Sequence, residues 1–166
     1  MEETKKYILS REVAQKKMRR MAYEILEHNL EEKEIILAGI RESGSVVAEN
    51  IQRMFAEISS IKTELITLSL DKKNPKEVLV SKSMDFTGKV IIVIDDVSMS
   101  GKTLLYALKP FLDFYPKKIQ TLVLVERSHT NFPVRPDYVG LSIASTLQEH
   151  IYVGVEGGDI TGAYLQ

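Results

Sequence analysis

Two adjacent carboxylates stand next to a loop of small residues in the segment KVIIVIDDVSMSGKTLLYAL, residues 89–108. Asp95 and Asp96 follow five apolar residues, and the loop after them runs from Ser98 to Thr103. Glycine and small hydroxyl residues let several backbone N–H groups turn toward one anion, and a helix that follows adds a favourable field. Carboxylates accept hydrogen bonds from hydroxyl groups. The segment therefore predicts a sugar-phosphate site, with the phosphate in the loop and ribose hydroxyls on the aspartates.

Two other interpretations of this segment stay open. The ending Ser-Gly-Lys-Thr matches the end of the nucleoside-triphosphate P-loop, G-x-x-x-x-G-K-[ST], but Asp96 stands at the first glycine position, where its carboxylate would repel a polyphosphate. ATP hydrolysis would support this interpretation. The other alternative is an acidic strand end followed by an ordinary capped helix, where Ser, Thr and Asp are common.

The rest of the chain predicts the elements that position this segment. Apolar strands alternate with amphipathic helices, and Ser10 is typical of the N-cap of the first helix. The expected strands are 34–40, 63–70, 89–96 and 118–126, and the expected helices are 11–29, 45–58 and 103–114. Pro110 should kink the last helix or begin a new turn, and 71–88 is interpreted as a mobile excursion. This order indicates a parallel sheet covered by helices on both faces.

Composition restricts the function classes. The 166 residues suit one domain, and 44% hydrophobic with 27% charged residues is typical of a globular protein. A formal net charge of −1 argues against a general polyanion binder. The lack of cysteine excludes disulfides, thiolate metal sites and a cysteine nucleophile. The start MEETKKYILS lacks the apolar run of a signal peptide, and no stretch has the length of a membrane span, so we expect a cytoplasmic protein without membrane partners.

The acidic pair and the following V-S-M-S-G-K-T resemble the ribose-5-phosphate-binding signature of the type I phosphoribosyltransferases, which use phosphoribosyl pyrophosphate. The segments REVAQKKMRRMAYEILEHN, ILAGIRESGSVVAENI and LVERSHTNFPVRPDYVGLSIAST are similar to blocks of one branch, the bifunctional pyrimidine-operon attenuation regulators and uracil phosphoribosyltransferases. The resemblance covers nearly the whole chain. It implies an α/β fold in a single domain over 1–166, with a parallel sheet, flanking helices and a small hood built largely from the segment around 127–155.

The resemblance also implies a role for each polar segment. Asp95 and Asp96 would be the catalytic residues, because they would hold the ribose hydroxyls and one would stabilise the positive charge that develops on the sugar. The other implied contacts are Val97, Ser98, Met99, Ser100, Gly101, Lys102 and Thr103 for the phosphoribosyl group; Arg41, Glu42, Ser43 and Gly44 for pyrophosphate; Lys72 and Lys73 in a lid; and Arg127, His129, Arg135, Asp137, Tyr138 and Val139 for the base and hood.

The implied reaction is displacement of pyrophosphate at ribose C1 by a nucleobase nitrogen, with uracil as the best guess. Mg2+ would be bound mainly through phosphoribosyl pyrophosphate, with no direct protein ligand, in keeping with its habit of taking few protein ligands. The implied partners are phosphoribosyl pyrophosphate, a nucleobase and a nucleoside monophosphate. A homodimer or larger homo-oligomer is also implied.

The chain departs from the family pattern in two places, and these keep an alternative function open. R-E-S-G replaces the usual K-T-R-G, so Ser43 stands in place of an arginine and Glu42 adds a negative charge, and the lid lacks its arginine. The alternative is a nucleotide-sensing regulator of pyrimidine genes with weak or no transferase activity, which would bind messenger RNA through basic residues of the first helix and through Arg127, His129 and Arg135. Plain structural interpretations also stay open: a solvated helix face, a packing histidine, and a turn capped by Ser43 or Ser45.

Overall fold

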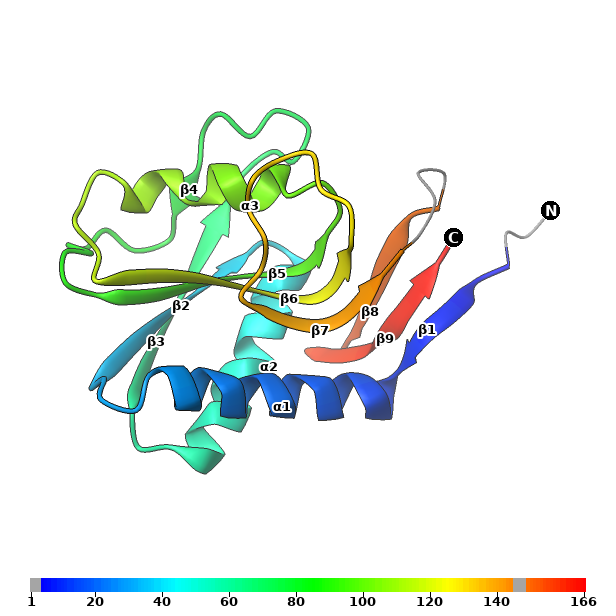
Figure 1. Ribbon diagram of the computed structural model, residues 1–166, viewed down its shortest axis with the longest axis horizontal. Helices are drawn as coiled ribbons and strands as arrows, with labels where there is room; N and C mark the ends of the chain where they lie inside the picture. The colour runs from blue at the N-terminus through cyan, green and yellow to red at the C-terminus, as the bar shows by residue number, and fades with distance from the viewer. Residues whose placement is uncertain (1–3, 145–148) are drawn as a thin grey trace.

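The computed structural model describes residues 4–144 and 149–166, and a six-stranded sheet forms its centre (Figure 1). The strand order is β4-β3-β2-β5-β6-β7, and every pair is parallel except β3 with β4. The strands are β2 (Glu34–Ile40), β3 (Lys62–Ser69), β4 (Leu79–Val80), β5 (Val90–Ser98), β6 (Lys118–Arg127) and β7 (Tyr138–Ile143). The predicted α/β class with a largely parallel sheet is confirmed.

Helices cover the two faces of this sheet and produce two separate cores. On one face lie α1 (Arg11–His28) and α2 (Ser43–Ile58), and on the other lie α3 (Lys102–Ala107) and the short 3-10 helix η1 (Lys109–Phe111) (Figure 1). Alternate residues of β5 point to opposite faces, so Ile92 joins the α1/α2 core and Ile91 joins the α3 core. Burial on both faces explains why the central strands are apolar throughout.

The helix boundaries follow local chemistry that the sequence already contains. The Ser10 hydroxyl accepts a hydrogen bond from the backbone N–H of Val13 at 3.2 Å, which confirms the predicted N-cap of α1. Pro110 lies in η1 just after α3 ends, so the expected new turn is also confirmed. Among the described residues, none of the helices is long and apolar enough to cross a membrane.

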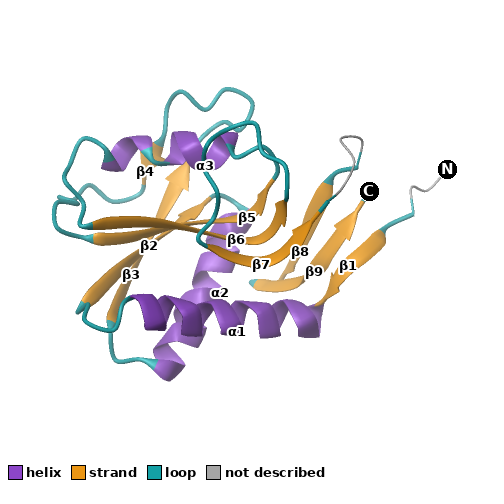
Figure 2. Cartoon of the chain, in the orientation of Figure 1, coloured by secondary structure: helices purple, strands orange, loops and turns teal. Residues whose placement is uncertain are grey.

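A second, three-stranded antiparallel sheet joins the two ends of the chain (Figure 2). Its order is β1 (Lys6–Ser10), β9 (Asp159–Leu165) and β8 (Ile151–Glu156). The sequence pattern leaves the first ten residues without an assigned strand, and the predicted hood is built largely from around 127–155. Within that range β7 belongs to the large sheet and β8 to the small one, while β1 and β9 lie outside it.

Candidate active site

The two aspartates lie inside a strand rather than at its end. Neighbouring β2 pairs with β5 as far as Gly39 and Ile94, whereas β6 stays paired with β5 through Ser98. Asp95 and Asp96 therefore lie just beyond the point where pairing with β2 stops and where pairing with β6 continues. The expected strand 89–96 would end at the aspartates, and this end is wrong. Pairing with β6 keeps the backbone extended through Ser98. Asp95 is only 1% exposed, and Asp96 is partly exposed.

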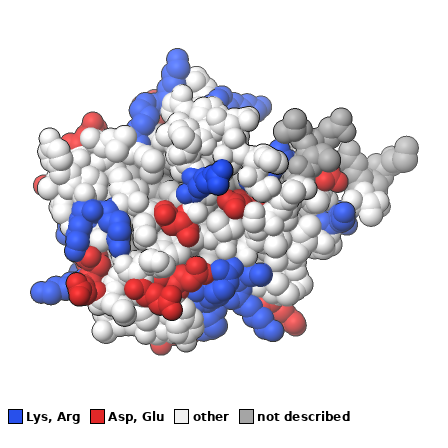
Figure 3. All heavy atoms as spheres, in the orientation of Figure 1, with Lys and Arg blue, Asp and Glu red and all other residues white. Residues whose placement is uncertain are grey.

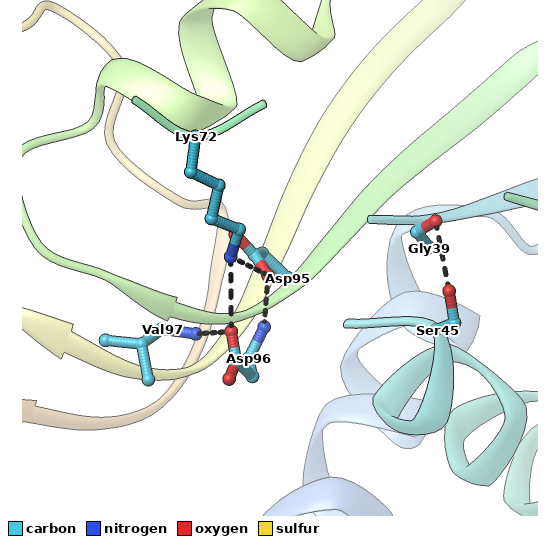
Figure 4. A network of polar contacts seen from close by, with 6 residues as sticks. All are labelled: Gly39, Ser45, Lys72, Asp95, Asp96 and Val97. Atoms are coloured by element: carbon cyan, nitrogen blue, oxygen red, sulfur yellow. Dashed lines mark hydrogen bonds and ion pairs between the residues drawn. The ribbon is translucent and has the colours of Figure 1, made fainter. Parts of the chain in front are cut away.

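Lys72 supplies the positive charge beside this pair (Figure 4). Its Nζ lies 3.3 Å from Oδ2 of Asp95 and 3.9 Å from Oδ1 of Asp96. The backbone N–H of Asp96 donates to Asp95 Oδ1 at 2.9 Å, and that of Val97 donates to Asp96 Oδ1 at 2.8 Å. Backbone and lysine together fix the orientation of both carboxylates.

The electrostatics of the pair follow from burial and proximity. Burial, and then the adjacent Asp96 carboxylate, raise the pKa of Asp95 well above its ordinary value, although Lys72 opposes this. Burial by itself would lower the pKa of Lys72, but the charges of Asp95 and Asp96 outweigh it and raise the pKa of the ammonium. A buried carboxylate that needs a counter-ion is typical of a functional site.

The predicted phosphate loop forms a pocket of about 210 Å³ directly after the aspartates. Gly101 adopts the left-handed backbone conformation, with φ of 84°, and α3 begins at the next residue. The Ser98 hydroxyl is buried and has no hydrogen-bond partner within the described part of the chain, which is costly without a ligand. The pocket is lined by Lys72, Asp96, Val97, Ser98, Met99, Ser100, Gly101, Thr103, Leu104 and Ile151.

The R-E-S-G loop adjoins the aspartates through Gly44. A Cβ at Gly44 would lie 2.9 Å from the carbonyl oxygen of Ile94 and 3.0 Å from Asp95 Oδ1, so only glycine fits without displacement. The peptide bond between Arg41 and Glu42 is cis, and both side chains are exposed.

The N-terminus of α2 differs from the capped turn that stayed open in the sequence analysis. Its N-cap residue is Glu42, whose side chain makes no capping hydrogen bond. The Ser45 hydroxyl instead donates to the carbonyl of Gly39 at 3.4 Å. Capping by Ser43 or Ser45 is therefore wrong, because the helix begins one residue earlier than a Ser43 cap would require and three residues earlier than a Ser45 cap would require.

The residues expected around the base are dispersed. Arg127 is buried, and its guanidinium donates to the carbonyl of Glu149 at 2.7 Å. Asp137 accepts a hydrogen bond from the backbone N–H of Thr121 at 2.8 Å. Burial raises the pKa of Tyr138 to about 12, and its hydroxyl donates to Gln120 at 2.7 Å. The contacts of Asp137 and Tyr138 join β6 to the start of β7, whereas the Arg127 contact joins β6 to the residues just before β8. The base-binding role stays a prediction.

The segment that contains His129 and Arg135 supports the phosphate loop through its backbone. The N–H groups of Asn131 and Phe132 both donate to the carbonyl of Ser100, at 3.0 and 3.1 Å. A Cβ at Gly101 would lie 3.1 Å from the carbonyl oxygen of Val134. This support was not predicted, because main-chain contacts leave no local pattern of side-chain types. Ile151 was not predicted as a pocket residue either, because it lies far from the loop in the sequence.

Comparison with known proteins decides the family. Residues 6–156 match the family model described as "Phosphoribosyl transferase domain". The chain belongs to the phosphoribosyltransferase family. This confirms the predicted family and the predicted enzyme class, a transferase of the pentosyl type.

Curated relatives match this phosphoribosyltransferase over most of its length. The bifunctional protein PyrR of Haemophilus ducreyi is 34% identical over 164 residues, which cover 93% of this chain and 92% of that protein. The bifunctional protein PyrR of Oceanobacillus iheyensis is 37% identical, with coverage of 92% and 91%. The predicted resemblance to the bifunctional branch is thereby confirmed.

Solved structures show the same fold at lower identity. A hypoxanthine phosphoribosyltransferase of Trypanosoma cruzi superposes with a TM-score of 0.78 at 14% identity, covering 98% of this chain and 92% of that chain. A hypoxanthine-guanine phosphoribosyltransferase of Bacillus anthracis gives 0.74 at 24% identity, covering 90% and 88%. At these identities the likeness concerns the fold alone.

Proposed function

We propose that this phosphoribosyltransferase transfers the 5-phosphoribosyl group from phosphoribosyl pyrophosphate to a nucleobase nitrogen and releases pyrophosphate. The observation that supports this proposal is a carboxylate pair, with Asp95 buried and Asp96 partly exposed, that leads directly into a pocket of about 210 Å³ beside the unpartnered hydroxyl of Ser98. The choice of uracil rests on the branch that the sequence resembles.

The geometry supports a division of roles among these residues. The carboxylates of Asp95 and Asp96 accept hydrogen bonds from the ribose hydroxyls, and their charge stabilises the positive charge that develops on the sugar as the bond to pyrophosphate breaks. The loop from Ser98 to Thr103 holds the 5-phosphate and thus fixes the sugar in the orientation required for attack by the base. Arg41, Lys72 and Lys73 provide positive charge for pyrophosphate.

Mg2+ fits the donors that this site contains. The carboxylate oxygens of Asp95 and Asp96 are hard ligands of the kind Mg2+ prefers, and we propose that they hold it indirectly, through the ribose hydroxyls. Among the described residues, no group of three or more His, Cys, Asp or Glu side chains forms a cage for a metal. When bound with phosphoribosyl pyrophosphate, Mg2+ would neutralise part of the negative charge of the pyrophosphate leaving group.

The experiment that tests the proposed reaction measures pyrophosphate release from phosphoribosyl pyrophosphate and Mg2+. Uracil, cytosine, hypoxanthine, guanine, xanthine and orotate are offered one at a time. We expect release above the base-free rate with uracil, because the base is the nucleophile that displaces pyrophosphate from the sugar that the site holds in place. Release seen only with a purine base would identify that purine, and not uracil, as the substrate. Release with none of the six bases would contradict the transferase proposal.

RNA binding is a second candidate function, favoured by the name of the curated relatives, which denotes two functions. His129 and Arg135 are exposed on the segment that contacts the phosphate loop, and Arg135 supplies positive charge for RNA. Arg127 is a poor candidate because its side chain is buried. On the face that contains α1, Figure 3 shows a group of basic side chains directly beside a group of acidic ones, so the basic surface does not continue along the whole helix.

A filter-binding titration against pyrimidine leader RNA, with and without uridine monophosphate, tests this candidate. We expect nucleotide-dependent binding that weakens steeply with salt, because phosphate contacts by lysine and arginine release counter-ions. A scrambled RNA of equal length is the control. Equal binding of both RNAs would argue against a regulator.

Two proposals concern the protein in the cell. A homodimer or larger assembly and a cytoplasmic location both rest on the sequence analysis. Sedimentation of the purified protein checks the first, and a sedimenting monomer at micromolar concentration would contradict it.

A further inference from the structure

The loop after β3 directs one lysine toward the catalytic aspartates. In this loop the N–H of Asn74 donates to the carbonyl of Asp71 at 3.1 Å, and the N–H of Lys73 donates to the carboxylate of Asp71 at 3.0 Å. Pro75 is buried and anchors the far side of the turn. The turn thus fixes the backbone on both sides of Lys72, whose side chain extends to the aspartates (Figure 4).

The ammonium of Lys72 takes up the position between the two carboxylates. It lies 3.4 and 3.3 Å from Oδ1 and Oδ2 of Asp95, and 3.9 Å from Oδ1 of Asp96. Its side chain is 48% exposed, whereas that of Asp95 is 1% exposed, so the lysine approaches from the open side of the site. A ribose that gives its hydroxyls to the same carboxylates must enter from that side too.

We propose that Lys72 is an internal substitute for the sugar, which the ribose has to displace before it binds. In the free protein the ammonium satisfies Asp95 and Asp96 and holds the lid loop over the site. When ribose hydroxyls replace it, the ammonium is released beside the pyrophosphate group and pairs with that group instead. This inference rests on the proposed function. It adds that the Lys72 ammonium and the ribose hydroxyls compete for the carboxylates of Asp95 and Asp96.

The competition has opposite consequences for two ligands. Ribose 5-phosphate has no pyrophosphate, so it must break the lysine contact without gaining a new one. Phosphoribosyl pyrophosphate breaks the same contact but recovers a lysine–phosphate pair. Loss of the lysine charge should therefore strengthen binding of ribose 5-phosphate and weaken binding of phosphoribosyl pyrophosphate. A lysine that only bound pyrophosphate would leave ribose 5-phosphate affinity unchanged.

Calorimetric titration of both ligands, with Mg2+, into the wild type and Lys72→Met tests the inference. We expect ribose 5-phosphate to bind about fivefold more tightly to Lys72→Met, the upper range for a partly exposed ion pair. We expect phosphoribosyl pyrophosphate to bind more weakly to the same variant. Lys72→Arg keeps the charge and should bind ribose 5-phosphate like the wild type. Lys76→Met, an exposed lysine of the same loop, should leave both affinities unchanged.

The protonation state of Asp95 and the effect of the substitution itself each need a separate control. Because Lys72 opposes the raised pKa of Asp95, its loss favours a neutral carboxyl, and the titrations are therefore repeated at pH 7 and pH 9. Hydrogen exchange of the wild type provides a second measurement without any substitution. Ribose 5-phosphate should speed exchange of the amides in 71–76, because it releases the loop.

The outcomes separate this inference from the proposed function. Equal affinity of the wild type and Lys72→Met for ribose 5-phosphate at both pH values would overturn the displacement and leave the sugar-phosphate site intact. Absence of ribose 5-phosphate binding in both proteins would overturn the displacement and also contradict the proposed sugar-phosphate site. Tighter binding by Lys72→Met with unchanged Lys76→Met supports the displacement.

Discussion

Asp95→Asn combined with Asp96→Asn is expected to lower base-dependent pyrophosphate release by about 1000-fold or more, the size of effect seen when a preorganised electrostatic contact to a transition state is removed. Asparagine keeps the size and one acceptor oxygen of each side chain but removes the charge that stabilises the developing positive sugar. Pyrophosphate release at saturating phosphoribosyl pyrophosphate, Mg2+ and base measures the loss. Asp113→Asn, at an exposed aspartate outside the site, should retain full activity.

The pH dependence of stability shows whether residue 95 stays buried in its folded position after Asp95→Asn. A carboxyl whose pKa is raised on folding favours the folded state below its unfolded pKa, and this stability is lost as pH rises through the folded value. Asp95→Asn alone should therefore unfold at a higher temperature than the wild type at pH 8. The difference should shrink as pH falls toward 4. A variant that is inactive and also less stable at pH 8 would indicate a folding defect instead of a catalytic role.

Gly101→Ala is expected to lower affinity for phosphoribosyl pyrophosphate by about 100-fold, which corresponds to roughly 2.7 kcal/mol of binding free energy. An alanine there must adopt φ of 84°, which costs about 1–2 kcal/mol, and its Cβ would lie 3.1 Å from the carbonyl oxygen of Val134. The loop must shift, and its N–H groups then no longer point at the phosphate. Calorimetric titration with Mg2+ measures the change.

Gly88→Ala is the matched control for this loss. Gly88 has a similar φ of 75°, but a Cβ there would meet nothing within 4 Å. Both variants should lose about 1–2 kcal/mol of unfolding free energy from the backbone conformation, and only Gly101→Ala should lose ligand affinity. Comparable affinity losses in the two variants would show that the phosphate loop does not bind the ligand.

The sequence by itself determined the parts of this protein that depend on local patterns. The apolar runs at 34–40 and 118–126 became parallel strands because both faces of the sheet are covered, and the Ser10 hydroxyl capped α1 because its partner N–H is three residues away. The carboxylate pair and the small-residue loop are contiguous, so their chemistry was also readable without coordinates.

The tertiary structure alone decided what depends on residues far apart in the chain. Lys72 meets Asp95 across 23 positions, Asn131 supports Ser100 through main-chain atoms, and β1 pairs with β9 at the opposite end of the sequence. No periodicity marks such contacts, because they depend on where the sheet brings loops and termini together. The same folding placed Asp95 out of water and thereby raised its pKa. Residue types identified the candidate groups, and packing determined which of them face one another.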